Sequence, residues 1–155
     1  MTELNGIKIK TTFHSLDLWT GTPIADTYGN KTVLNSNGRP AFAELVALDY
    51  FMTQNYKGVW VDTYRKKFRI GLPETTEPVD LPTDIKEKFE KIINENYGLK
   101  GTWDLLLWKE QKLKFVELKR KGKDAIRQTQ IDFLIAAIKA GHEPDDFEIY
   151  EWDVT

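Results

Sequence analysis

The sequence predicts an α/β protein, because helix-like and strand-like segments alternate along its 155 residues. The helix-like segments span residues 40–54, 83–97 and 124–140, and the strand-like segments span residues 7–13, 58–64, 103–108, 115–119 and 147–152. Hydrophobic residues make up 41% of the chain and charged residues 30%, an ordinary balance for a globular protein. We therefore expect a single domain, in which the sequence assigns no role to the N-terminal extension at 1–39.

The first half of the chain contains one clear helix and one clear strand. Pro40 stands near the start of the helix, where proline is tolerated, and strong helix formers continue to Gln54. Apolar and β-branched residues at 58–64 predict a strand that could continue to Phe68. The prolines and acidic residues of segment 71–82 predict a loop.

The second half contains two further helices. Thr83 is expected to cap a helix that ends at Gly98, because threonine favours the first position and glycine the last. The basic residues 120–123 predict a turn. We expect the last helix to begin at Asp124 and to stop at Gly141.

Two strand-like segments on either side of the polar run 109–112 bring two acidic residues together. If this run is a four-residue hairpin loop, Trp108 lies opposite Leu113. The same register sets Asp104 opposite Glu117. Facing side chains have Cβ atoms about 4.5–5.5 Å apart, and like charges at that distance oppose pairing. The sequence therefore predicts a compensating cation at this position.

Lys119 belongs to the same group of side chains. Residues two apart on a strand point to the same face, so its ammonium stands beside Glu117. A hard divalent ion that is held by carboxylates, with most of its shell left to water and phosphate oxygens, fits this arrangement. Because acidic residues in hairpins are commonly solvated, the alternative is a solvent-exposed pair without a metal.

Two helical side chains are further candidates for the site. Glu44 falls between Leu48 and Phe51 on the apolar arc of its helix, and Asp49 is similarly flanked. Glu44 is therefore either a carboxylate that faces a metal or a partly solvated helix acid. Gln130 lies in the middle of the apolar face of the last helix, where a buried amide needs partners. It could cap a backbone group in the core or lean towards the hairpin.

Composition excludes several kinds of site. The chain has no cysteine, which excludes disulfides, thiolate metal sites and cysteine nucleophiles. His14 and His142 lie far apart in the sequence, which disfavours a histidine-rich zinc site. No apolar run is long enough to span a membrane, and the N-terminus lacks the pattern of a signal peptide. We expect a soluble, cytoplasmic protein with no membrane partner.

Positive charge is concentrated in two segments although the formal net charge is −2. The larger segment spans 109–127, and the smaller one spans 65–69. We expect a positive patch beside the hairpin, with solvated surface as the alternative. The candidate DNA-binding residues are Arg120, Lys121, Lys123, Arg127 and Lys66.

The pattern of these residues resembles the VRR-NUC branch of the PD-(D/E)XK nuclease superfamily, which includes phage and bacterial replication–repair nucleases. The matching residues, in chain order, are Glu44 on a helix, Gly58 at the next strand, Gly101-Thr-Trp-Asp104, Glu117-Leu-Lys119, and Gln130 eleven residues before Gly141. The resemblance covers residues 40–152, and Trp103 stands where many members have proline. It implies a restriction-endonuclease-like PD-(D/E)XK core, in which a mixed β-sheet is flanked by α-helices.

The resemblance also implies roles for the site residues. It assigns Mg²⁺ or Mn²⁺ to Asp104, Glu117, the carbonyl of Leu118 and, at an outer position, Glu44. Lys119 would orient or help deprotonate the attacking water and neutralise charge in the transition state, and Gln130 would brace the site.

We accordingly expect a divalent-metal-dependent nuclease that hydrolyses DNA phosphodiester bonds in replication or repair. Selectivity for junctions or flaps is compatible with so small a chain. We expect no organic cofactor. Both a monomer and a homodimer are compatible with the sequence. One alternative is a non-catalytic nucleic-acid-binding or assembly module that retains the nuclease fold. Another is a small protein-interaction domain that binds no metal.

Overall fold

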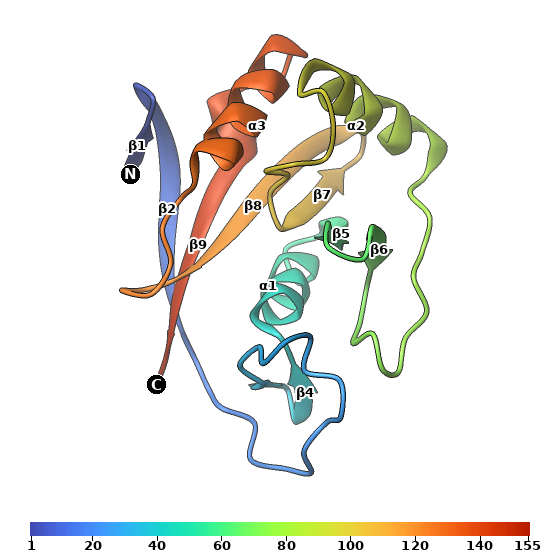
Figure 1. Ribbon diagram of the computed structural model, residues 1–155, viewed down its shortest axis with the longest axis vertical. Helices are drawn as coiled ribbons and strands as arrows, with labels where there is room; N and C mark the ends of the chain where they lie inside the picture. Colours follow the sequence, from blue (N-terminus) through green and yellow to red (C-terminus); the bar gives the residue numbers. More distant parts are fainter.

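The computed structural model describes residues Met1 to Thr155, and its main feature is a seven-stranded sheet (Figure 1). The strands of this sheet are β1 (Thr2–Leu4), β2 (Ile7–Leu16), β5 (Lys57–Asp62), β6 (Lys67–Arg69), β7 (Leu105–Lys109), β8 (Lys112–Arg120) and β9 (Phe147–Val154). Their order across the sheet is β1-β2-β9-β8-β7-β5-β6. A separate small hairpin consists of β3 (Leu34–Ser36) and β4 (Arg39–Ala41).

The sheet is mixed. β9 runs parallel to both of its neighbours, β2 and β8, and all the other pairs are antiparallel. The connection from β8 to β9 contains a helix, as parallel neighbours require. The expected α/β fold, with a mixed sheet flanked by helices, is confirmed at this level.

Three helices cover the two faces of the sheet. They are α1 (Ala43–Met52), α2 (Thr83–Glu95) and α3 (Gln128–Lys139), and a short 3-10 helix spans Pro144–Asp146. α2 and α3 lie side by side on one face, whereas α1 packs on the other (Figure 1). Each face of the sheet has its own apolar core, one formed with α2 and α3 and the other with α1. Along β7, Leu106 and Trp108 belong to the core on the α2 and α3 side, and Leu105 and Leu107 belong to the core on the α1 side. This alternation is what a strand buried on both faces produces.

The β7–β8 hairpin has the predicted register but a shorter loop. Trp108 pairs with Leu113 as expected. Lys109 also pairs with Lys112, so only Glu110 and Gln111 remain in the loop instead of four residues. Glu110 has a φ of +58°, a left-handed conformation typical of tight hairpin turns. The opposition of the two acidic positions is preserved, because shortening the loop symmetrically leaves the register unchanged.

Several predicted helix boundaries were wrong. Pro40 lies in β4, where it pairs with Asn35, so α1 begins three residues later, at Ala43. Thr83 is the first helical residue of α2, and the capping position belongs to Pro82. α3 begins at Gln128 instead of Asp124.

The late start of α3 has a local cause. The carboxylate of Asp124 accepts a hydrogen bond of 3.0 Å from the backbone N–H of Arg120. The backbone N–H of Asp124 itself donates to the carbonyl of Arg120. Asp124 therefore closes the turn that follows β8, and it is not available to begin a helix.

The segments at both ends of the first half also differ from expectation. The strand predicted at 58–68 is a hairpin, because a turn at 63–66 separates β5 from β6. The N-terminal extension is part of the main sheet, since β2 pairs with β9 over seven residues, Lys10–Leu16. None of the helices combines the length and the apolar character that a membrane span needs.

Candidate functional site

Asp104 and Glu117 hold each other in place across the start of the β7–β8 hairpin. Glu117 accepts a hydrogen bond of 3.1 Å from the backbone N–H of Asp104 with its Oε1 atom. Asp104 accepts one of 2.9 Å from the backbone N–H of Leu118 with its Oδ2 atom. These reciprocal bonds fix both carboxylates on the two strand backbones. The predicted opposition of the two acids is therefore present, although Asp104 lies just before the first residue of β7.

The electrostatics of the pair are unfavourable when both groups are charged. Burial raises the pKa of Asp104 to about 6, and the negative charge of Glu44 adds to this effect. Burial and then the charge of Asp104 raise the pKa of Glu117 well above its ordinary value. The backbone geometry thus holds two carboxylates where a cation would stabilise their ionised forms.

Lys119 and Gln130 converge on the Glu117 carboxylate. Lys119 Nζ lies 3.3 Å from Glu117 Oε2, and both side chains are buried. Gln130 Nε2 donates a hydrogen bond of 2.6 Å to the same oxygen. The amide of Gln130 thus leans towards the hairpin, which is one of the two arrangements that the sequence left open.

Two contacts at the start of α3 aim Gln130 at the hairpin. Its Oε1 atom accepts a hydrogen bond of 2.9 Å from the backbone N–H of Arg127, and its backbone carbonyl accepts one from the Trp103 indole. Gly101 allows the segment before Trp103 to approach the backbone of α3 closely. It has a φ of +81°, and a Cβ there would lie 2.0 Å from the carbonyl oxygen of Thr129.

Glu44 is buried, with 7% of its surface exposed, and it does not point to solvent. Its Oε2 atom lies 2.6 Å from the ammonium of Lys31. Burial opposes the charge of Lys31, but the attraction of Glu44 outweighs it and raises the pKa of the lysine. Sequence reasoning missed Lys31, because no local pattern links a lysine in the long loop after β2 to a helix that begins at Ala43.

One cavity of about 800 Å³ collects the candidate residues. Its lining includes Glu44, Asp104, Glu117, Leu118, Lys119 and Gln130, the six predicted catalytic and metal-binding residues. Four basic residues also line it: Lys31, Lys66, Lys100 and Arg127. Lys31 is paired with Glu44, whereas the other three have exposed side chains. The cavity therefore combines buried or partly buried acids with a rim of accessible positive charge, which consists of Lys66, Lys100 and Arg127.

The predicted DNA-binding residues divide into two groups. Lys66 and Arg127 line the cavity, but Arg120, Lys121 and Lys123 do not. Arg120 is held by the carboxylate of Asp153 at 3.3 Å and by the Thr32 hydroxyl at 3.2 Å.

Two other acids of the first half, Asp49 and Asp62, are engaged elsewhere. Asp49, which like Glu44 has apolar neighbours on the helical wheel, is exposed and accepts a hydrogen bond from the Ser36 hydroxyl. Asp62 is buried and paired with Arg69 at 2.7 Å. Neither lines the cavity, so Glu44 is the helical acid that belongs to this site.

Asp104 and Glu117 supply the oxygen donors that a hard divalent cation prefers. No group of three or more His, Asp or Glu side chains lies close enough together to hold a metal by itself. Mg²⁺ is commonly bound by one or two carboxylates, with water and substrate phosphate completing its octahedron. Asp104 uses Oδ2 for the bond to Leu118, which leaves Oδ1 for a cation. The pair of Asp104 and Glu117 thus fits a hydrated divalent ion, and Glu44 lines the same cavity.

The raised pKa of Asp104 predicts a specific dependence of stability on pH. Its folded pKa of about 6 exceeds the ordinary value of 3.8, so the native state holds the proton more tightly. This contribution is fully present below about pH 4 and is lost as the pH rises through 6. Because the pKa of Glu117 is also raised, stability should continue to fall as the pH increases further.

We expect Asp104→Asn, which cannot ionise, to be more stable than the parent at pH 8 in EDTA. The gain should be about 1–2 kcal/mol, a modest value because cavity water still reaches Asp104, and it should shrink towards pH 4. Urea unfolding from pH 4.5 to 8 measures it, with Asp49→Asn as the control. Equal stability of Asp104→Asn and the parent at pH 8 would show that the pair is not strained.

A comparison with protein-family models and a search of curated proteins found no match to this sequence. The residues that line the cavity are therefore the main indication of what the protein does. The six predicted catalytic and metal-binding residues among them come from four separate parts of the chain: α1, the residue just before β7, β8 and the start of α3. The fold brings them together although they are distant in the sequence.

Proposed function

We propose that this protein is a divalent-metal-dependent nuclease that hydrolyses DNA phosphodiester bonds. The observation that carries the proposal is the pair of Asp104 and Glu117, fixed face to face beside the ammonium of Lys119 in one cavity. Two carboxylates and a lysine suit a reaction in which negative charge develops on a phosphoryl group. The exposed basic residues on the rim suit a polyanionic substrate.

The resemblance to the VRR-NUC branch of the PD-(D/E)XK superfamily supports the same proposal. Its motif residues lie on elements that follow one another in the expected order: a helix with Glu44, a strand at Gly58, Asp104 at a hairpin, the E-x-K on the second hairpin strand and Gln130 on a helix. Apart from Gly58, these residues line one cavity, as a PD-(D/E)XK core would require. A mixed sheet flanked by helices is compatible with such a core.

Asp104 and Glu117 would hold Mg²⁺ or Mn²⁺, with the carbonyl of Leu118 and with Glu44 at an outer position. When bound, the metal would lower the pKa of water and polarise a phosphoryl oxygen. Gln130 holds the Glu117 carboxylate in position through its 2.6 Å bond. Lys119 places a fixed positive charge beside the reacting phosphate, where it stabilises the transition state.

The direct test incubates the purified chain with labelled single-stranded, duplex, flap and junction DNA, in Mg²⁺, in Mn²⁺ and in EDTA. The proposal expects cleavage of at least one substrate that requires the metal and that leaves a 5′-phosphate and a 3′-hydroxyl. If no substrate is cleaved in either metal, the alternative of a non-catalytic nucleic-acid-binding module is favoured. Failure to bind any DNA would favour the protein-interaction domain.

The position of the basic residues predicts which of them contact DNA. Each lost phosphate contact on duplex DNA should reduce the slope of log affinity against log salt by about 0.9. Replacing Lys66, Lys100 and Arg127 with alanine should therefore reduce the slope by roughly 2–3 and weaken binding to all sequences alike. The matched control replaces Arg120, Lys121 and Lys123, which lie off the cavity lining.

We expect the control triple variant to keep most of the affinity and slope of the parent. Fluorescence anisotropy at several salt concentrations, in EDTA to prevent cleavage, measures both quantities. If the control variant loses more affinity than the cavity variant, DNA approaches along the turn after β8 and not over the cavity rim.

A further inference from the structure

The turn between β5 and β6, residues 63–66, carries an exposed aromatic side chain at the rim of the cavity. Tyr64 is 84% exposed and is one of the cavity-lining residues. Tyr97, which is 98% exposed, lies away from the cavity. Tyr64 is thus the large aromatic side chain that is both accessible and adjacent to the proposed active site.

A buried ionic network fixes this turn on the sheet. Asp62, with 2% of its surface exposed, accepts hydrogen bonds from Arg69 Nε at 2.7 Å and from the backbone N–H of Arg65 at 3.0 Å. The hydroxyl of Tyr28 donates to the same carboxylate. Asp62, Arg69 and Tyr28 therefore hold the base of the turn from two directions, although none of them is required by the proposed reaction.

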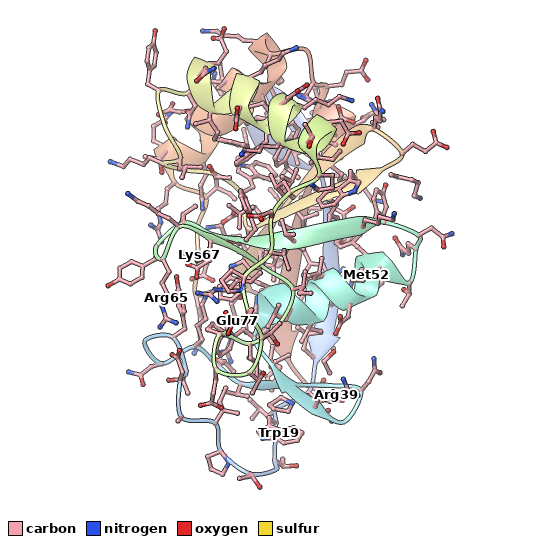
Figure 2. All side chains as sticks on the ribbon, turned by 90° about the vertical axis from the view of Figure 1, so that its right-hand side faces the viewer. Trp19, Arg39, Met52, Arg65, Lys67 and Glu77 are labelled. Carbon is pink, nitrogen blue, oxygen red and sulfur yellow. The ribbon has the colours of Figure 1, made fainter.

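The surroundings of the Tyr64 ring leave much of it accessible. The Tyr28 ring meets it at a centroid distance of 6.0 Å in an edge arrangement, which supports it on one side. Arg65 extends away towards the N-terminal loop (Figure 2), where it pairs with Asp26 at 2.9 Å. A ring that is positioned before binding loses little conformational entropy when a ligand stacks on it.

Positive charge accompanies the ring. Lys66 has a φ of +56°, and its exposed side chain also lines the cavity. An aromatic platform next to a cation is the combination with which proteins bind unpaired nucleotides, because every base has a face that stacks and every nucleotide has a phosphate. In a duplex the base faces are already stacked on one another, so such a platform favours unpaired nucleotides.

We propose that Tyr64 and Lys66 form a subsite for one unpaired nucleotide of a single-stranded tail or flap. The base stacks on the Tyr64 ring, the adjoining phosphate contacts Lys66, and the strand continues over the cavity towards Asp104 and Glu117. This inference names the substrate class of the proposed nuclease site and rests on that function. In this proposal, the buried network of Asp62, Arg69 and Tyr28 serves to hold the turn at 63–66 in position.

The test measures the affinity of a hairpin DNA with a three-nucleotide tail against that of the same hairpin with a blunt end, in EDTA. The parent should prefer the tailed hairpin roughly 5- to 100-fold, the range expected for stacking of one base. Tyr64→Ala should lose this preference, whereas Tyr64→Trp should retain it. Tyr97→Ala, the matched control, should behave as the parent does.

Removal of single bases from the tail tests the same contact from the side of the DNA. In the parent, an abasic site at one tail position should reproduce the loss caused by Tyr64→Ala. In Tyr64→Ala the same abasic site should cause no further loss, because the stacking partner is already absent. This experiment remains decisive if Tyr64→Ala folds poorly, since the abasic scan with the parent and with Tyr64→Trp needs no truncated ring.

Three results would overturn the inference: no preference of the parent for the tailed hairpin, an unchanged preference in Tyr64→Ala, or additive losses from the variant and the abasic site. The first two results would show that Tyr64 binds no unpaired base, and the third would show that Tyr64 and the tail base contribute to binding through separate contacts. Metal-dependent cleavage of duplex DNA that requires Asp104 would stand independently of these outcomes. If cleavage does not require Asp104, in turn, the nuclease proposal is refuted, and the binding measurement is not affected.

Discussion

Asp104→Asn is expected to reduce metal-dependent DNA cleavage by about 10³-fold, because it removes a charged ligand from a two-carboxylate site. Asparagine keeps an oxygen that can accept the 2.9 Å hydrogen bond from the Leu118 backbone, so the hairpin should remain intact. A single-turnover cleavage assay in saturating Mg²⁺ measures the effect. The circular dichroism spectrum of the same sample, together with a cooperative urea transition whose midpoint is not below that of the parent, establishes that the variant is folded.

Asp104 is a better position for this test than Glu117. Both oxygens of Glu117 accept hydrogen bonds, from the Asp104 backbone on one side and from Gln130 on the other. A glutamine there would turn an NH₂ group towards a donor and would perturb the site for a second reason. Asp49→Asn is the matched control, because Asp49 is an exposed acid outside the cavity lining. Cleavage by Asp104→Asn at the rate of the control would contradict the assignment.

Lys119→Met is expected to lower the turnover number by about 10²–10³-fold and to change DNA affinity little. In the proposed reaction the lysine would act through charge that is needed chiefly in the transition state, so its removal should affect turnover more than binding. Methionine fills a similar volume and is tolerated at a buried position. The carboxylate of Glu117 keeps its bonds to Gln130 and to the Asp104 backbone in this variant.

The comparison needs cleavage rates at saturating DNA and dissociation constants measured separately in EDTA. Lys121→Met is the control, because Lys121 is an exposed lysine just beyond the same strand and does not line the cavity. If Lys119→Met weakens binding and leaves turnover unchanged, the lysine holds substrate in its ground state and has no special role in the reaction.

The candidate site was predictable from the sequence where its geometry is local. A hairpin register depends on a few neighbouring residues, so the opposition of Asp104 and Glu117 followed from the pairing of Trp108 with Leu113. The shared face of Glu117 and Lys119 followed from the period of a strand. Gln130 stood out because an amide on an apolar face must find partners, and Glu117 supplies one.

The rest of the site depends on contacts between distant segments, which a local pattern does not contain. Lys31 reaches Glu44 only because the loop after β2 folds back towards α1. The pairing of β2 with β9 likewise joins residues from opposite ends of the chain. The division of 58–68 into β5 and β6 was missed because its turn has no glycine or proline and uses Lys66 in a left-handed conformation.

The basic residues illustrate the same limit at the surface. A run such as Arg120-Lys121-Gly122-Lys123 indicates where charge is in the sequence but not which way each side chain points. Arg120 is turned towards Asp153 and Thr32, whereas the isolated Lys100 lines the cavity. Charge clusters therefore predicted a basic surface more reliably than they predicted its members.

The most direct test of a metal-dependent site at Asp104 and Glu117 measures bound Mn²⁺ and DNA cleavage in the same titration. Electron paramagnetic resonance reports free Mn²⁺, and a labelled tailed hairpin reports the cleavage rate. We predict that in the parent the cleavage rate rises with the fraction of bound Mn²⁺, and that Asp104→Asn shows neither tight binding nor cleavage. Cleavage that persists in Asp104→Asn, or Mn²⁺ binding equal to that of the parent, would contradict the account.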